Sequence, residues 1–149
     1  MKWTINDRSV PVTTQLGTVA VRVDGDPEGS PLLLCQRFRG TMDDWDPEFV
    51  ALLALGRKVI RFDSAGVGES SGIAPNTVHG MAEFVPALLD ALDIEFADLL
   101  GWSLGGYVAQ TVALEWPTRV LFDLQGLPAR HAGDVGGDDQ HEQLAFLHS

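Results

Sequence analysis

The chain has 149 residues, 45% of them hydrophobic, which is the size and composition of one globular domain with a hydrophobic core. Its formal net charge of -11 argues against nucleic acids and anionic membranes as partners, because both bind clustered basic residues. The single cysteine, Cys35, excludes an internal disulfide, and no apolar run reaches the length of a membrane span. We therefore expect a soluble, cytoplasmic protein without a cleaved signal peptide.

The beginning of the chain predicts a strand pair and then a buried strand. Residues 9–16 and 18–23 are rich in Val and Thr, which indicates two antiparallel strands at the edge of a sheet. Residues 24–31 have the Asp, Gly, Pro and Ser content of a loop. The continuous apolar run at residues 32–35 then predicts a short strand that is covered on both faces.

A helix and a further strand are expected next. Asp43 or Asp44 is the predicted N-cap of a helix that ends near Gly56. Residues 58–63 then predict a strand, because this short run contains the apolar residues Val59, Ile60 and Phe62. A strand, a helix and a strand in succession favour a parallel arrangement.

The second half of the chain continues this alternation. A loop over residues 64–75 leads to a helix with Asn76 or Thr77 as its N-cap. The apolar side chains of this helix recur at helical spacing and are Met81, Phe84, Val85, Leu88, Leu89 and Leu92. Pro86 lies among them and is expected to kink or break the helix. Together the elements predict an α/β fold with a predominantly parallel sheet and helices on both faces.

The pattern weakens after Val120. Residues 121–124 predict a sixth short strand, and residues 143–148 predict one helical turn. Between these segments, residues 128–140 are rich in Gly and Asp and contain little that is apolar. We therefore expect a single domain over residues 1–149 that is incomplete after about the sixth strand, with residues 128–149 as a loop or disordered tail.

A serine flanked by two glycines follows the apolar run that ends at Leu100. Gly101, Ser103 and Gly105 match G-x-S-x-G, the pattern of a nucleophile on a sharp turn between a strand and a helix. Small neighbours permit the strained turn, which exposes the serine hydroxyl and aims the amide of Leu104 at a developing oxyanion. The alternative interpretation is that the two glycines serve close packing alone.

Three motifs in this order resemble the α/β-hydrolase superfamily. Residues 32–40 are similar to the family's apolar strand followed by H-G-x-x-G, and residues 59–70 to its strand followed by D-x-x-G-x-G-x-S. Residues 101–106 are similar to its nucleophile elbow. The resemblance extends over residues 17–120, which is the N-terminal part of the fold.

The resemblance implies roles for individual residues of the elbow and of the loop after residue 35. Ser103 corresponds to the nucleophile, and the amide of Leu104 to one donor of the oxyanion hole. Phe38 corresponds to the residue with the second amide donor, which does not depend on side-chain type. Gln36 and Arg37 stand where the family has His and Gly, so the outer wall of the hole is altered.

The acid and the histidine that follow the serine in this family have no clear counterpart. His131 and His141 are the candidate bases, with His148 further on, and Asp134, Asp138 and Asp139 lie nearby. A Gly- and Asp-rich segment positions side chains poorly for catalysis. Too few residues follow the elbow helix for two further strand–helix units. We therefore expect a shortened hydrolase that is inactive if the usual acid and histidine are missing, and that associates with a second copy through its uncovered sheet edge or is marginally stable.

Two classes of function remain open from the sequence. The first is a serine hydrolase that acts on a small-molecule ester or lactone, with perhydrolase or haloperoxidase-like chemistry as a variant on the same elbow. The second is a non-catalytic fragment, or a binding or assembly module, that keeps the fold without its chemistry. Neither class predicts a cofactor.

Other candidate sites in the sequence are weak. The glycines Gly66 and Gly68 suggest a nucleotide loop, but Ser71 stands where a dinucleotide fingerprint requires Gly or Ala. The histidines and the cysteine lack the spacing of metal ligands. Cys35 is expected to be a buried thiol and His79 a surface histidine. Arg37 and Arg39 are expected to be solvated loop charges, with binding of an anionic substrate as the alternative.

Overall fold

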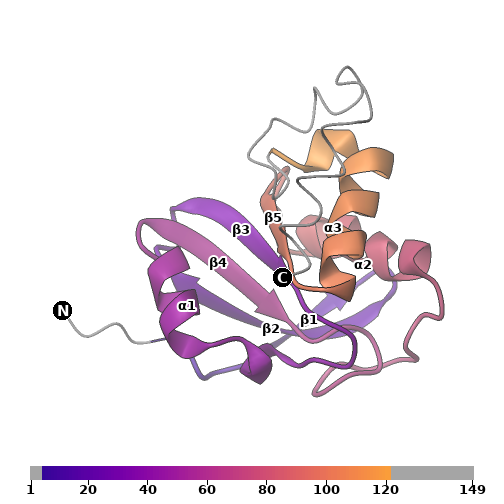
Figure 1. Cartoon of the computed structure of the whole chain (residues 1–149), viewed down its shortest axis with the longest axis horizontal. Helices are drawn as coiled ribbons and strands as arrows, with labels where there is room; N and C mark the ends of the chain where they lie inside the picture. The colour runs from indigo at the N-terminus through magenta and orange to yellow at the C-terminus, as the bar shows by residue number, and fades with distance from the viewer. Residues whose placement is uncertain (1–4, 122–149) are drawn as a thin grey trace.

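A five-stranded sheet with helices on both faces forms the body of the computed structural model, which describes residues 5–121 (Figure 1). The strands are β1 (Val10–Thr14), β2 (Gly17–Gly25), β3 (Ser30–Cys35), β4 (Arg57–Phe62) and β5 (Asp98–Gly101). The helices are α1 (Pro47–Leu53), α2 (Val78–Ala91) and α3 (Leu104–Glu115), with 3-10 turns at Met42–Asp44 and Pro117–Arg119. None of the helices in this described part of the chain has the length and apolar character needed to cross a bilayer.

The strand order is β1-β2-β4-β3-β5, and the sheet is mixed. β3 pairs in parallel with β4 and β5, whereas β2 pairs antiparallel with β1 and β4. The predicted antiparallel pair at a sheet edge is confirmed, but the expectation of a predominantly parallel sheet holds only for the strands from β3 onward. The turn between β1 and β2 is too short for the crossover that a parallel pair requires, which explains that pair, while the antiparallel pairing of β2 with the distant strand β4 is set by the path of the chain between them.

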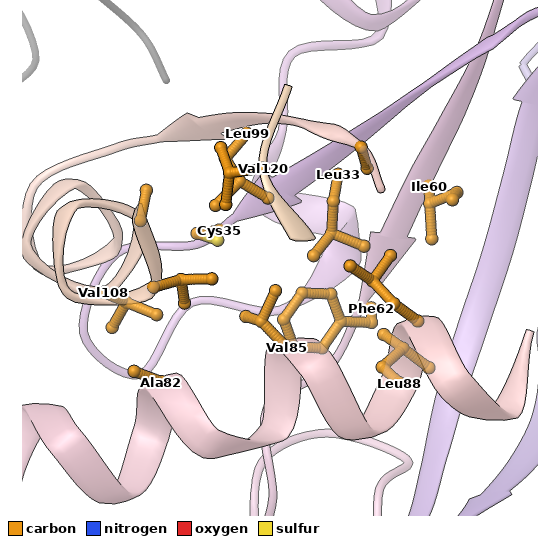
Figure 2. Packing of buried hydrophobic residues seen from close by; sticks show 14 of the residues in the cluster. Leu33, Cys35, Ile60, Phe62, Ala82, Val85, Leu88, Leu99, Val108 and Val120 are labelled. Atoms are coloured by element: carbon orange, nitrogen blue, oxygen red, sulfur yellow. The ribbon is translucent and has the colours of Figure 1, made fainter. Parts of the chain in front are cut away.

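The sheet has a hydrophobic cluster on each face because successive strand residues point to opposite sides. Leu33 of β3 and Ile60 of β4 belong to the cluster that packs against α2 and α3 (Figure 2). Their neighbours Leu32 and Val59 belong to the second cluster, which includes Val50 of α1. The prediction of helices on both faces of the sheet is therefore confirmed.

The start of α1 differs from the expectation. Asp46 is the N-cap, and its Oδ1 accepts a hydrogen bond of 3.0 Å from the amide of Phe49. Asp43 and Asp44 instead lie in the preceding 3-10 turn, which Thr41 caps. Several acidic residues in one short stretch can each serve as a cap, so the sequence pattern alone could not select among them.

Helix α2 begins after Thr77, one of the two predicted caps, whose Oγ1 accepts a hydrogen bond of 3.0 Å from the amide of Gly80. The helix continues through Pro86, so of the two predicted alternatives, a kink or a break, the break does not occur. A proline in a helix interior costs about 3 kcal/mol. Burial of Val85, Leu88 and other apolar residues on the sheet side of α2 offsets that cost.

The glycine-rich segment after β4 is fixed by Asp63. The Asp63 carboxylate accepts hydrogen bonds from the amides of Met42 (2.8 Å) and Glu69 (2.9 Å). A Cβ on Gly68 would lie 2.2 Å from Asp63 Oδ2, so only glycine fits there. Ser70 Oγ donates to the Asp63 carbonyl at 2.6 Å and accepts from Ala20 at 2.9 Å. The Asp, Gly and Ser residues of the D-x-x-G-x-G-x-S motif are therefore explained by packing and hydrogen bonds within the protein.

The described chain ends beside β5, where Val120 forms a parallel bridge with Ala97. The predicted strand at residues 121–124 lies outside the described residues apart from Leu121, whose amide donates to the Ala97 carbonyl at 3.0 Å. The predicted loop at 128–140 and helical turn at 143–148 lie entirely outside them.

Cys35 is buried in the cluster under α2 and α3, as predicted, and burial raises the pKa of its thiol from 9.0 to about 12. Between pH 9 and about 12 the unfolded chain loses this proton while the folded chain keeps it, so the free energy of unfolding falls as pH rises. We expect that fall to be smaller in Cys35→Ala, as measured by urea unfolding at several pH values. Rapid reaction of the native wild-type thiol with a disulfide reagent at pH 8 would contradict its burial.

Candidate active site

Ser103 lies on the turn that joins β5 to α3, with only Trp102 between it and the end of the strand. Its backbone has φ 55° and ψ -119°, a conformation that costs a residue other than glycine about 1–3 kcal/mol. Both Trp102 and Ser103 are exposed. The turn therefore places the Ser103 hydroxyl at the surface, at the edge of the sheet where the parallel strands end.

The two glycines of the turn are required by close backbone approach. A Cβ on Gly101 would lie 2.3 Å from the carbonyl oxygen of Gly105, and a Cβ on Gly105 would lie 2.0 Å from the carbonyl oxygen of Cys35. The first turn of α3 therefore packs directly against the end of β3 and against the end of β5, the strand that precedes α3. This contact brings Ser103 close to the loop that follows Cys35.

The amides of Leu104 and Phe38 are available as hydrogen-bond donors. Leu104 is the first residue of α3, and within residues 5–121 neither amide donates a hydrogen bond. Both residues line the same pocket, which has a volume of about 370 Å³. The positive end of the α3 dipole adds to the attraction of this region for negative charge. Ser103 itself lies beside this lining and is not part of it.

Gln36 shapes the loop that carries Phe38, a role that the sequence did not indicate. Its buried side chain accepts a hydrogen bond from the amide of Arg37 (2.8 Å) and donates one to the carbonyl of Thr41 (2.8 Å). A Cβ on Gly40 would lie 2.5 Å from Gln36 Cγ, so the loop closes tightly over this side chain. Gln36 therefore fixes the loop in a conformation that leaves the Phe38 amide without a hydrogen-bond acceptor within residues 5–121.

Trp102 forms an aromatic wall next to Ser103. Its ring lies 5.8 Å from that of Trp45, and the guanidinium carbon of Arg37 lies 5.5 Å from the Trp102 ring centre. Arg37 also approaches Asp44, at 3.5 Å between Nη2 and the carboxylate. These contacts connect the loop after β3 to the elbow, and no local pattern in the sequence predicts them.

No described side chain serves Ser103 as a base. The described residues contain one histidine, His79, whose nitrogens contact Glu83 (2.9 Å) and Glu115 (2.7 Å). Glu115 ends α3, a helix of 12 residues that starts next to Ser103, so His79 lies about 18 Å along the helix axis from it. His79 is an exposed surface histidine, as predicted. The candidate bases His131 and His141 lie outside the described residues.

Comparison with known proteins gives consistent matches over this part of the chain. The family described as alpha/beta hydrolase fold matches residues 30–121. The chain is 37% identical over 102 residues to rhodomycin D methylesterase DauP of Streptomyces sp. (strain C5), covering 65% of this chain and 34% of that protein. It is 36% identical over 103 residues to 3-oxoadipate enol-lactonase 1 of Acinetobacter baylyi, covering 68% of this chain and 38% of that protein.

A solved structure agrees with these matches. The alpha/beta hydrolase fold protein from Chitinophaga pinensis superposes with a TM-score of 0.76 at 36% sequence identity, covering 81% of this chain and 43% of that protein. The chain thus spans less than half the length of each of these three proteins.

Proposed function

The chain belongs to the α/β-hydrolase fold family, and from that premise we propose that it hydrolyses small-molecule esters or lactones with Ser103 as nucleophile. One observation carries the proposal. Ser103 is held with φ 55° on an exposed turn next to a pocket that two unbonded amides, those of Leu104 and Phe38, line together. The names of the two curated relatives, a methylesterase and an enol-lactonase, support attack on a carbonyl carbon.

In the proposed reaction, Ser103 Oγ attacks the carbonyl carbon of the substrate while a base takes its proton. The carbonyl oxygen becomes an oxyanion that accepts hydrogen bonds from the amides of Leu104 and Phe38. Collapse of this intermediate breaks the carbon–oxygen bond to the alcohol, which takes up the proton, and leaves an acyl group on Ser103. Water then hydrolyses the acyl-enzyme to the acid and free serine. His131 and His141 are the proposed sources of the base.

Labelling of the full chain with a neutral fluorophosphonate tests this proposal. This probe reacts with serines that are activated as nucleophiles. We expect one label per chain, located on Ser103 by mass spectrometry of the peptides, and no label after heat denaturation. The absence of label from protein that unfolds cooperatively would contradict the proposal.

The second candidate function is a non-catalytic binding or assembly module with the hydrolase fold. It is favoured by one observation, which is that no side chain within residues 5–121 accepts a hydrogen bond from Ser103. A folded, unlabelled chain that forms dimers in light-scattering measurements would support this function, and dimerisation through a sheet edge would agree with the expected association of two copies.

A further inference from the structure

The pocket beside Ser103 differs in charge from the rest of the protein. The chain carries 21 acidic and 10 basic residues, for a net charge of -11. The lining of the pocket, drawn from the described residues, contains neither Asp nor Glu but does contain two arginines, Arg37 and Arg39. Within an acidic protein, this pocket is therefore a local site of positive charge.

The two arginines have different surroundings. Arg37 contacts the Asp44 carboxylate at 3.5 Å and donates to the Phe38 carbonyl at 3.2 Å, so its charge is partly compensated. The guanidinium carbon of Arg39 lies 5.3 Å from the centre of the Phe38 ring, and Arg39 forms no ion pair with any carboxylate in residues 5–121. An aromatic ring orients a guanidinium without neutralising its charge. Arg39 therefore keeps an uncompensated positive charge at the pocket.

The backbone at Arg39 is strained. Its φ is 58°, and the amide of Gly40 donates to the Arg37 carbonyl at 3.0 Å, which makes Arg39 the third residue of a tight turn. Glycine is the residue that adopts this conformation at least cost. An arginine at this position makes the fold less stable than a glycine would. The guanidinium side chain is therefore what distinguishes this residue from the glycine that the backbone favours.

We propose that the substrate of this pocket carries a free carboxylate, and that Arg39 binds it. The proposal rests on the ester or lactone hydrolysis proposed above and adds the substrate class. A guanidinium matches a carboxylate with two parallel hydrogen bonds. Arg39 directly follows Phe38, whose amide holds the oxyanion in the proposed reaction. The proposed substrate class is a short ester or lactone with a free carboxylate, as in a monoester of a dicarboxylic acid or a lactone of a hydroxy dicarboxylic acid.

Two ligands of equal size test the proposal by binding. Monoethyl succinate carries the carboxylate, and ethyl succinamate replaces it with a neutral amide. Both are titrated by calorimetry into the full chain carrying Ser103→Ala, so that no turnover occurs. We expect the anion to bind about tenfold more tightly than the amide, from one charge-assisted pair of hydrogen bonds.

Two further variants in this background assign the preference to Arg39. Arg39→Gln should reduce the preference for monoethyl succinate over ethyl succinamate to about onefold. Arg39→Gly should reduce the preference equally and should also unfold at a higher temperature than the parent, because glycine relieves the positive φ. Arg8→Gln removes the same charge from a residue outside the pocket lining and should leave the preference unchanged. A preference that persists in Arg39→Gln, or falls equally in Arg8→Gln, would overturn the proposal.

The outcome for Arg39 is separate from the outcome for Ser103. Fluorophosphonate labelling of the wild-type chain uses a neutral probe without a carboxylate, so it reports on Ser103 independently of the carboxylate preference. Labelling without a carboxylate preference would refute the substrate class and leave the hydrolase intact. A carboxylate preference without labelling would refute the hydrolysis and leave an anion-binding pocket.

Discussion

Replacement of Ser103 by alanine is expected to lower the rate of ester hydrolysis by about 10⁴-fold or more, because the oxygen that forms the acyl-enzyme is lost. The amides of Leu104 and Phe38 remain in Ser103→Ala, so substrate binding should change little. The measurement is kcat and KM for a neutral p-nitrophenyl ester, and the loss should be confined to kcat.

A second variant separates this loss from a loss of folding. Ser103→Gly removes the same hydroxyl and also relaxes the positive φ of 55°. It should be as inactive as Ser103→Ala but should unfold at a higher temperature. Ser30→Ala, which removes the hydroxyl of an exposed serine outside the pocket lining, is the matched control and should retain most of the activity. Residual activity of more than a few per cent in both Ser103 variants would exclude this serine as the nucleophile.

The largest expected effect on stability comes from a buried ion pair between β2 and β4. Arg61 Nε lies 2.8 Å from Asp24 Oδ2, and only 1% of each side chain is exposed. Arg61 also donates to the carbonyls of Asn6 (2.8 Å) and Met42 (3.2 Å), so one side chain connects the N-terminal segment, the sheet and the loop before α1. Asp24→Ala would leave the guanidinium buried without a carboxylate, and we expect it to destabilise the fold by about 3–5 kcal/mol.

An ion pair with one solvent-exposed partner provides the control for this measurement. Arg22 pairs with Asp43, and 73% of the Asp43 side chain but only 12% of the Arg22 side chain is exposed, so we expect its loss to cost about 1 kcal/mol, the upper end of the range for surface pairs. Urea unfolding of Asp24→Ala and Asp43→Ala should therefore differ several-fold in the free energy lost. Similar small losses in both variants would show that water reaches Arg61 in the folded protein.

The elbow was predictable from the sequence because its physical requirements are local. Gly101, Ser103 and Gly105 lie within five residues, and the close approach of Gly101 to Gly105 is a contact inside that same turn. The periodicity of apolar residues likewise predicted α2 from its neighbours alone. The order of strands and helices followed from these local patterns and was sufficient to indicate the α/β-hydrolase fold.

The tertiary structure decided which distant residues meet. β2 runs antiparallel to β4, with Val21 paired to Phe62. Arg61 of β4 is buried against Asp24 of β2, which lies 37 positions away in the chain. Nothing in the local sequence indicates either pairing, because both depend on strand register and on the path of the chain between them.

The character of the pocket was also a matter of tertiary structure. The sequence placed Arg37 and Arg39 in one loop as equivalent charges, and only the fold set Asp44 and Trp102 against Arg37 while leaving Arg39 without a carboxylate. The sequence by itself therefore determined the fold family and the position of the proposed nucleophile, since these depend on backbone geometry over a few residues. The tertiary structure decided the mixed sheet, the buried ion pair and the charge of the pocket, since these depend on contacts between segments that are distant in the chain.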